Sequence, residues 1–184
     1  MDFAIPAAIS QDLDRLRDFI RIQLVPDLPS WTRKQKMPKT FFHRMGAGGW
    51  YGFKVKGGCL VRESALREAI LAEELAKASP GVAIVSLAHV DLGLMGLFLF
   101  GSQSLHQAYG ASALQGKTVM CLGNTENTAG SDVAGISMSA DKVDDGWILN
   151  GTKAYVTNGL IADLGVITAV SDPKATRNKR LSNP

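Results

Sequence analysis

The chain has 184 residues, of which 46% are hydrophobic and 20% are charged, and its formal net charge at pH 7 is +3. This composition excludes a disordered chain and is typical of a globular protein with one or two domains. The small net charge gives no general electrostatic case for binding nucleic acid. The two cysteines, Cys59 and Cys121, are too few for a disulfide framework, and the apolar surroundings of Cys121 favour a buried thiol.

The first part of the chain is predicted to be helical. Apolar residues recur there at three- and four-residue spacing, which is the pattern of helices that bury one face. Prolines and glycines interrupt the pattern, with Pro26 after the first helix and Pro80-Gly81 before the fourth. Helices are expected at residues 10–25, 39–45, 62–77, 82–100 and 101–114, with a glycine-rich region at 46–58.

The segment Val82–Phe100 is long and apolar enough to be mistaken for a membrane span. However, His89 and Asp91 lie near its centre, and it lacks basic flanks. These features favour a buried helix at the centre of a bundle, so we predict no membrane span. His89 is interpreted as a satisfied histidine of the core or surface rather than as a contact to substrate.

After Gly116 the pattern changes to short β-branched or alternating runs separated by turns. Strands are expected at residues 119–122, 136–140, 147–149, 154–156 and 166–170. Asn150-Gly151 is the strongest signal for a hairpin turn, because both residues tolerate positive φ. We therefore predict an α+β protein, with an all-helical bundle at 1–116 followed by an incomplete antiparallel β-barrel or sandwich at 117–184.

Two segments of the predicted β region are rich in small residues, hydroxyls and turn formers. Residues 125–132 read Thr-Glu-Asn-Thr-Ala-Gly-Ser-Asp, and residues 149–159 read Leu-Asn-Gly-Thr-Lys-Ala-Tyr-Val-Thr-Asn-Gly. Neither contains a charge cluster that could hold a metal, so no metal site is expected. Both are typical of backbone turns that bind a flat cofactor carrying phosphates.

These segments resemble those of the acyl-CoA dehydrogenase family. Its members usually carry Thr-Glu-Pro-x-Ala-Gly-Ser-Asp and then Asn-Gly-x-Lys-x-Trp-Ile-Thr-Asn-Gly, in the same order and at a similar separation. The chain departs from this pattern at Asn127, where proline is usual, and at Tyr155, where tryptophan is usual. The resemblance extends over the whole chain and is strongest from Phe100 to Pro173.

The resemblance implies an oligomeric FAD-dependent enzyme that desaturates an acyl-CoA thioester. In this family a carboxylate base removes the α-proton, a hydride passes from the β-carbon to flavin N5, and the electrons go on to an electron-transfer flavoprotein. Thr157 matches the residue that hydrogen-bonds flavin N5, and Tyr155 is expected on the same strand face, against the isoalloxazine. The remaining cofactor contacts implied are Leu122, Asn124 and Thr125 at the pyrimidine edge, and Gly130 and Ser131 at the pyrophosphate.

Each hydroxyl taken alone is explained equally well as a turn or strand residue. Glu126 and Asp132 are interpreted as supports for the backbone rather than as acid–base groups. For substrate binding we assign Ser131 together with Val85, Ala88 and Leu92, which share a helix face at i, i+3 and i+7. Ala88 is small, which would leave room for a medium or bulky acyl group.

No catalytic residue is assigned within the chain, because the glutamate base of the family is expected beyond Pro184. The family's C-terminal helical domain, which also holds much of the adenosine half of FAD, is likewise not matched. A partial β-domain leaves strand edges unpaired. We therefore expect the remaining half of the enzyme as a separate chain or a missing fragment.

Two alternatives to the dehydrogenase remain. An acyl-CoA oxidase or flavin monooxygenase of the same fold would pass electrons to oxygen, and a non-catalytic or complementing subunit would complete the site of a partner.

Eight basic residues between Asp27 and Glu63 form a solvated surface, or else a face for coenzyme A phosphates or an acidic electron acceptor. The first residues, Met1 to Pro6, lack the features of a secretory signal, which predicts a cytoplasmic location.

Overall fold

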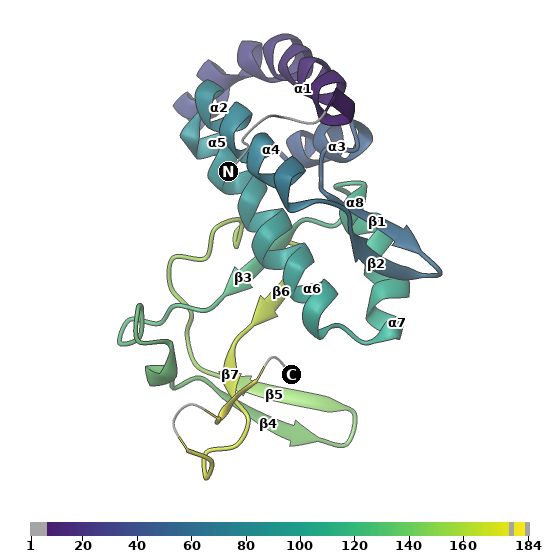
Figure 1. Ribbon diagram of the computed structural model, residues 1–184. Helices are drawn as coiled ribbons and strands as arrows, with labels where there is room; N and C mark the ends of the chain where they lie inside the picture. The colour runs from purple at the N-terminus through teal and green to yellow at the C-terminus, as the bar shows by residue number, and fades with distance from the viewer. Residues whose placement is uncertain (1–6, 177–178, 183–184) are drawn as a thin grey trace, which may run out of the picture.

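The computed structural model describes residues 7–176 and 179–182, so the residues from which the cytoplasmic location is predicted lie outside the described part. Residues 7–116 form helices and one β-hairpin (Figure 1). The helices are α1 (Ala7–Phe19), α2 (Leu28–Lys34), α3 (Lys39–Ala47), α4 (Ala65–Ala78), α5 (Pro80–Leu87), α6 (Met95–Phe100), α7 (Gln103–Leu105) and α8 (Ala111–Leu114). The hairpin consists of β1 (Phe53–Lys56) and β2 (Cys59–Arg62).

In the described part of the chain, three π-helical segments extend or join these helices. Ile20–Leu24 continues α1, and His106–Gly110 joins α7 to α8. Ala88–Leu94 joins α5 to α6, so that a single helix runs from Pro80 to Phe100. The first helix starts earlier than predicted, at Ala7, and ends in a 3-10 turn, Val25–Asp27, which contains the expected breaker, Pro26.

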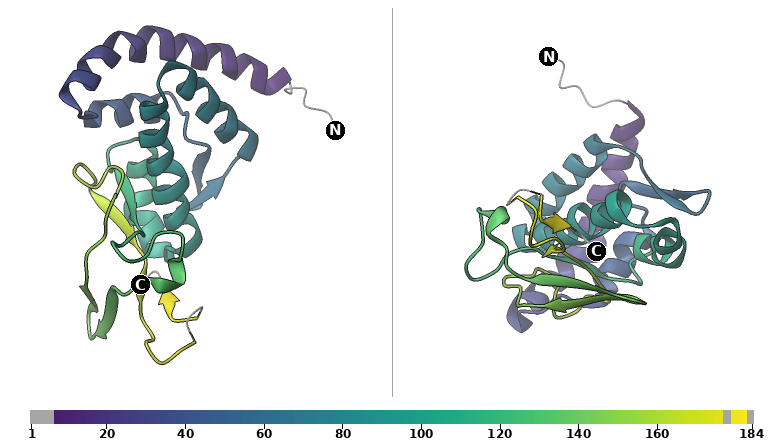
Figure 2. Two further views of the ribbon diagram at one scale, coloured as in Figure 1. Left: turned by 90° about the vertical axis from the view of Figure 1, so that its left-hand side faces the viewer. Right: turned by 90° about the horizontal axis from the view of Figure 1, so that it is seen from below.

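The long helix Pro80–Phe100 is the axis of the molecule. Helices α1 to α3 cross over one end of it, and strands β3 (Met120–Gly123) and β6 (Leu164–Ile167) lie along its other half (Figures 1 and 2). It is the one described helix that is long and apolar enough to cross a membrane. Its inward side chains Val82, Val90, Leu94 and Leu97 belong to the main hydrophobic core, as predicted for a bundle helix.

The second part of the chain forms partial sheets, and among the described residues no barrel closes. A four-stranded sheet has the order β5-β4-β7-β8. Its strands are β4 (Ser139–Val143), β5 (Gly146–Asn150), β7 (Ala169–Val170) and β8 (Leu181–Ser182). The prediction of helices followed by a partial β region is confirmed. The expected antiparallel order holds for β4–β5 and β7–β8, whereas β3–β6 and β4–β7 pair in parallel because the chain crosses over between them.

Two local predictions in the β region were wrong. The hairpin turn lies at Asp144-Asp145, since Val143 pairs with Gly146, whereas Asn150 pairs with Ser139 at the opposite end of the ladder. Gly151 is needed for close packing, because an added Cβ would lie 2.8 Å from the side chain of Met138. Residues 154–156 form a loop rather than a strand, because Tyr155 adopts a left-handed conformation with φ of 55°.

The hairpin β1–β2 was not predicted, although the glycine-rich region contained its signal. Gly57 and Gly58 form the turn with φ of 58° and 79°, values that glycine adopts without strain. Cys59 pairs with Lys56 just after this turn, and Cys121 is buried in β3 as expected.

The basic region between Asp27 and Glu63 is partly neutralised inside the fold. Four of its cations form ion pairs: Lys39 with Asp163, Arg44 with Asp27, Lys54 with Glu63, and Arg62 with Glu68. The other four, Arg33, Lys34, Lys36 and Lys56, are exposed. The region is therefore divided over several elements, and half of its charge is paired with carboxylates of the chain.

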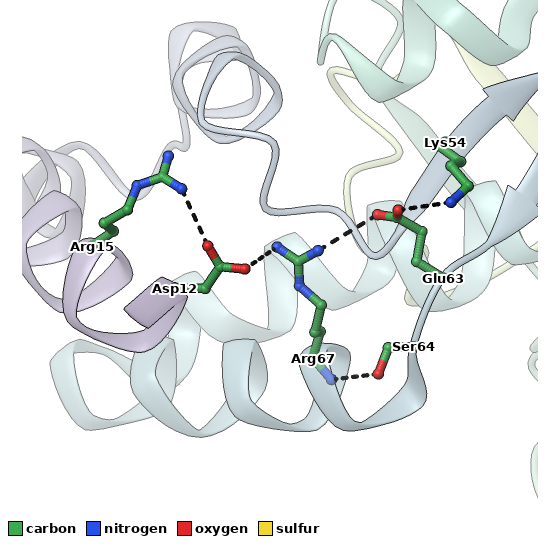
Figure 3. Close-up of polar contacts among 6 residues, drawn as sticks. All are labelled: Asp12, Arg15, Lys54, Glu63, Ser64 and Arg67. Carbon is green, nitrogen blue, oxygen red and sulfur yellow. Dashed lines mark hydrogen bonds and ion pairs between the residues drawn. The ribbon is translucent and has the colours of Figure 1, made fainter. Parts of the chain in front are cut away.

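An ion-pair network holds α1 against α4 and the hairpin (Figure 3). Asp12 accepts hydrogen bonds from Arg15 at 3.2 Å and from Arg67 at 2.8 Å, and Arg67 also lies 3.7 Å from Glu63. Glu63 in turn accepts from Lys54 on β1 at 3.2 Å. Arg67 is therefore the central cation that links three elements.

Replacing Arg67 with methionine is expected to lower the free energy of unfolding by about 1 kcal/mol, because a partly exposed ion pair contributes at most about that much. Urea denaturation measures the change. The matched control is Arg21→Met, whose partner Asp18 is also exposed, and which should alter stability by less than about 0.5 kcal/mol. Equal losses in the two variants would show that the network adds nothing to an ordinary surface pair.

Candidate functional site

A cavity of about 240 Å³ lies where the two sequence motifs meet. Its lining comes from three separate parts of the chain, namely the π-helical part of the long helix, the end of β3 with the loop after it, and the loop between β5 and β6. The lining residues are Leu92, Leu122, Asn124, Thr125, Ala154, Tyr155 and Thr157. The structure thus brings five of the seven predicted cofactor contacts together in one place.

The other two predicted cofactor contacts, Gly130 and Ser131, do not line this cavity. Both are exposed in the turn that follows a short antiparallel bridge between Glu126 and Ala129. An added Cβ at Gly130 would meet no atom within 4 Å, so the space beside this backbone is open on the side where a side chain would project.

Hydrogen bonds join the two motif loops, residues 124–126 and 153–154, directly behind the cavity. Ala154 N–H donates to the carbonyl of Thr125 at 2.8 Å. The Lys153 ammonium donates to the carbonyl of Asn124 at 3.0 Å and to Glu126 Oε1 at 2.8 Å. These bonds flank Thr125 on one loop and Tyr155 on the other, so they fix the distance between two walls of the cavity.

Glu126 is the acceptor at the centre of this junction. Besides Lys153, it accepts from the N–H and Oγ of Ser137 at 2.8 and 2.7 Å and from the N–H of Met138 at 2.9 Å. Burial acts to raise the pKa of Glu126, but the hydrogen bonds from Lys153, Ser137 and Met138 outweigh it and lower the pKa to about 2. A carboxylate so fully bonded supports the backbone, which is the role predicted for it.

Tyr155 is the most unusual residue of the lining. Its side chain is 92% exposed although it borders the cavity, and its left-handed backbone separates it from the strand geometry expected for it. The ring therefore does not share a strand face with Thr157. An exposed aromatic surface beside hydroxyl and amide groups is suited to a flat ring system with a polar edge, so the residues present fit a flavin ring.

The helix residues predicted to line an acyl pocket do not form one wall. Leu92 borders the cavity, Ala88 is buried, and Val85 lines a different cavity beside Trp31. The expectation assumed α-helical spacing from Val85 to Leu92. The π-helical segment starts at Ala88, and its wider turns rotate the residues that follow away from that spacing.

His89 is fully buried and connects three elements. Its Nε2 donates to the carbonyl of Ala113 at 3.1 Å, and its Nδ1 accepts from the N–H of Met120 at 3.0 Å. Burial lowers the pKa of His89 to about 4, against the smaller opposing effect of the bond to Ala113. Its interpretation as a satisfied core histidine is confirmed.

Asn158 is a structural residue of the site that the sequence reasoning missed. Its side-chain amide donates to the carbonyl of Val85 at 3.0 Å and to that of Met120 at 3.3 Å. Its φ of 68° is left-handed, a conformation that asparagine tolerates better than most residues. The sequence signal for this role was the position of Asn158 before Gly159 in the Thr-Asn-Gly turn.

Among the described residues, no group of three or more histidine, cysteine, aspartate or glutamate side chains is placed to hold a metal.

Comparison with known proteins places this geometry in a family context. Residues 10–117 match the family described as "Acyl-CoA dehydrogenase, N-terminal domain", and residues 121–182 match "Acyl-CoA dehydrogenase, middle domain". The short-chain specific acyl-CoA dehydrogenase of Megasphaera elsdenii is 33% identical over 178 residues, which cover 94% of this chain and 46% of that protein. The chain spans about half or less of the length of the curated relatives it matches.

Two solved structures are similar over nearly all of the chain. An acyl-CoA dehydrogenase from Geobacillus kaustophilus superposes with a TM-score of 0.89 at 26% identity, covering 99% of this chain and 48% of that one. The FAD complex of PigA superposes with a TM-score of 0.84 at 28% identity, covering 94% of this chain and 46% of that one.

Proposed function

The chain belongs to the acyl-CoA dehydrogenase family, and from this premise we propose that it forms part of the flavin and acyl-binding walls of an FAD-dependent enzyme that desaturates an acyl-CoA thioester. One observation carries the proposal. Five positions that the family motifs assign to flavin contact come from segments far apart in sequence, and they line a single cavity. The FAD present in the similar structure of PigA is consistent with it.

In this proposal each lining residue has a separate task. The Thr157 hydroxyl faces the reactive edge of the flavin ring, Asn124 and Thr125 bind its pyrimidine edge, and Tyr155 covers one face. Gly130 and Ser131 bind the pyrophosphate from the exposed turn. Leu92 lies where the cavity meets the long helix and contacts the acyl group. FAD, when bound, supplies the hydride acceptor that no side chain provides.

The catalytic base comes from outside these residues in our proposal. Among the residues that the structure describes, no carboxylate lines the cavity. Glu126 is held by Lys153, Ser137 and Met138, which leaves it unsuited to accept a proton from substrate. We propose that further polypeptide, in the same or another chain, supplies a glutamate and the adenosine site. We also propose an electron-transfer flavoprotein as the electron acceptor and an oligomeric state, as the family resemblance implies.

The lack of a carboxylate in the lining also favours a second candidate function. The chain would then be a complementing subunit that builds one wall of a site on a partner polypeptide. The two candidates differ in whether the flavin that reacts is held in this chain's cavity or in a site carried by a companion, so sequencing any polypeptide that co-purifies with the chain separates them. A companion that carries both the glutamate and its own complete flavin site would favour the non-catalytic role.

Replacing Thr157 with alanine tests the assignment of the cavity. The variant should retain FAD but be reduced more slowly by acyl-CoA, because the activation free energy should rise by about 1–3 kcal/mol, the value of one hydrogen bond to a polar centre. Stopped-flow absorbance of the flavin measures the rate. The control is Thr152→Ala in the same loop, since Thr152 is exposed and outside the lining. Wild-type reduction by the Thr157 variant would remove this hydroxyl from the mechanism.

A further inference from the structure

The three walls of the cavity meet at the backbone of Met120, the first residue of β3. Its N–H donates to His89 of the long helix, and its carbonyl accepts from Asn158 of the loop between β5 and β6. Both polar groups of this residue are therefore held by side chains from the other two walls. We propose that His89 and Asn158 are positioning residues that clamp Met120 and thereby set the spacing of the cavity that binds flavin.

Each clamp residue lies next to a residue of the lining. Asn158 directly follows Thr157, His89 precedes Leu92 by three residues, and Met120 precedes Leu122 by two. A displacement at the clamp is therefore passed to the lining through one to three residues of backbone. Displacement of a reacting group by about 1 Å can cost on the order of 100-fold in rate, so this joint bears on function as well as on stability.

The Asn158 side chain spans the joint with a single amide group. Its nitrogen donates to both Val85 of the helix and Met120 of β3, which uses both of its hydrogens. The backbone carbonyl of Asn158 accepts from the N–H groups of Ile161 and Ala162 at 2.9 and 2.8 Å, so the turn that carries this side chain is fixed as well. Both the conformation and the chemistry of this position therefore suit asparagine.

The other side of the clamp is rigid because His89 cannot turn. Its ring centroid lies 4.8 Å from that of Tyr51 and 5.4 Å from that of Phe42, and both rings belong to the core. Its two ring nitrogens are bonded to Met120 and Ala113. The long helix thus holds the His89 Nδ1 acceptor at a fixed place. The N–H of Met120 bonds to it two residues before Leu122, the residue of β3 that lines the cavity.

Replacing Asn158 with glycine tests the clamp, because glycine retains the left-handed backbone and removes only the amide. In the purified protein reconstituted with FAD, we expect the dissociation constant for FAD to rise about tenfold and hydrogen exchange to increase at residues 120–125 and 155–157. Exchange in the hairpin β1–β2 should not change. Asn158→Asp should have the larger effect, since it places a carboxylate opposite two carbonyls.

The matched control is Gln35→Gly, because Gln35 is also left-handed, with φ of 48°, but lines a different cavity. It should bind FAD as the wild type does. For the other half of the clamp, His89→Gln, which offers a donor and an acceptor, should retain more FAD affinity than His89→Leu.

The inference rests on the proposed flavin site, but the two can fail separately. If the wild-type protein binds no FAD, the proposed function fails, and hydrogen exchange still decides whether Asn158 clamps Met120. If Asn158→Gly binds FAD with wild-type affinity and exchanges normally at residues 120–125, the clamp is refuted. A loss of protection that spreads equally through β1–β2 would also overturn it, because that outcome indicates a general loss of stability.

Discussion

Replacing Lys153 with methionine is expected to lower the free energy of unfolding by about 3–5 kcal/mol, because it removes one partner of a buried ion pair. The side chains of Lys153 and Glu126 are only 6% and 5% exposed, and their charged atoms lie 2.8 Å apart. Without Lys153 the Glu126 carboxylate stays buried with a net charge. Denaturation in urea at neutral pH measures the loss.

Two controls give this result its meaning. The double variant Glu126→Gln with Lys153→Met removes both charges and should be less destabilised than Lys153→Met alone, since no uncompensated charge remains. Lys77→Met removes a half-exposed lysine that pairs with exposed Glu73 and with Glu74, which keeps its two bonds from Arg17, and should cost less than about 0.5 kcal/mol. If Lys153→Met costs no more than Lys77→Met, the junction behind the cavity does not depend on this ion pair.

Acidification is expected to destabilise the protein through His89 by about 3 kcal/mol between pH 6.5 and pH 4. In the fold, burial lowers the pKa of His89 from 6.5 to about 4. Within that interval the unfolded chain binds a proton that the folded chain does not, so stability rises with pH and is lost as the pH falls. The magnitude follows from about 1.4 kcal/mol for each pKa unit.

His89→Gln should flatten this part of the stability profile, because glutamine can make the same type of hydrogen bonds without titrating. His43→Gln is the control, since His43 is exposed, and its profile should follow that of the wild type. Glu126 adds a second loss at lower pH, below about 4.5, as its carboxylate is protonated against a folded pKa of about 2. A wild-type profile that is flat from pH 6.5 to pH 4.5 would contradict the buried neutral histidine.

The helical half of the fold could be predicted because its pattern is local. Apolar residues at helical spacing identified α1, α3, α4 and the long helix, and prolines and glycines marked most of their ends. The pattern did not show that the long helix widens into a π-helical segment at Ala88. The widened segment includes His89, whose bonds reach Ala113 and Met120, residues distant in sequence. It moved Leu92 off the helix face that it was expected to share with Val85 and Ala88.

The β half could be predicted only in outline, because strand pairing joins residues far apart in sequence. Asn150-Gly151 has the composition of a hairpin turn, yet the turn forms at Asp144-Asp145. Gly151 instead allows the side chain of Met138 to pack directly against its backbone, where a Cβ would clash. Tyr155 looked like a strand residue, whereas the bond from Ala154 to Thr125 bends the chain out of a strand there.

The candidate site was predictable at the level of its motifs. Of the seven cofactor contacts that the resemblance implied, five line one cavity, although the sequence carries no information on the distances between them. The residues that hold the cavity together were not predicted. Lys153 was part of the quoted motif without an assigned role, and the bonds of Asn158 and His89 to Met120 join positions 38 and 31 residues apart.

The most direct test of the central claim is the visible absorption spectrum of the purified protein after incubation with excess FAD and removal of free flavin, recorded beside its native mass. The account predicts a bound flavin band in a complex that contains this chain, with a mass that reveals any companion polypeptide. A colourless 19.7 kDa species, still without flavin after co-expression with any companion, would contradict the assignment of the cavity to FAD.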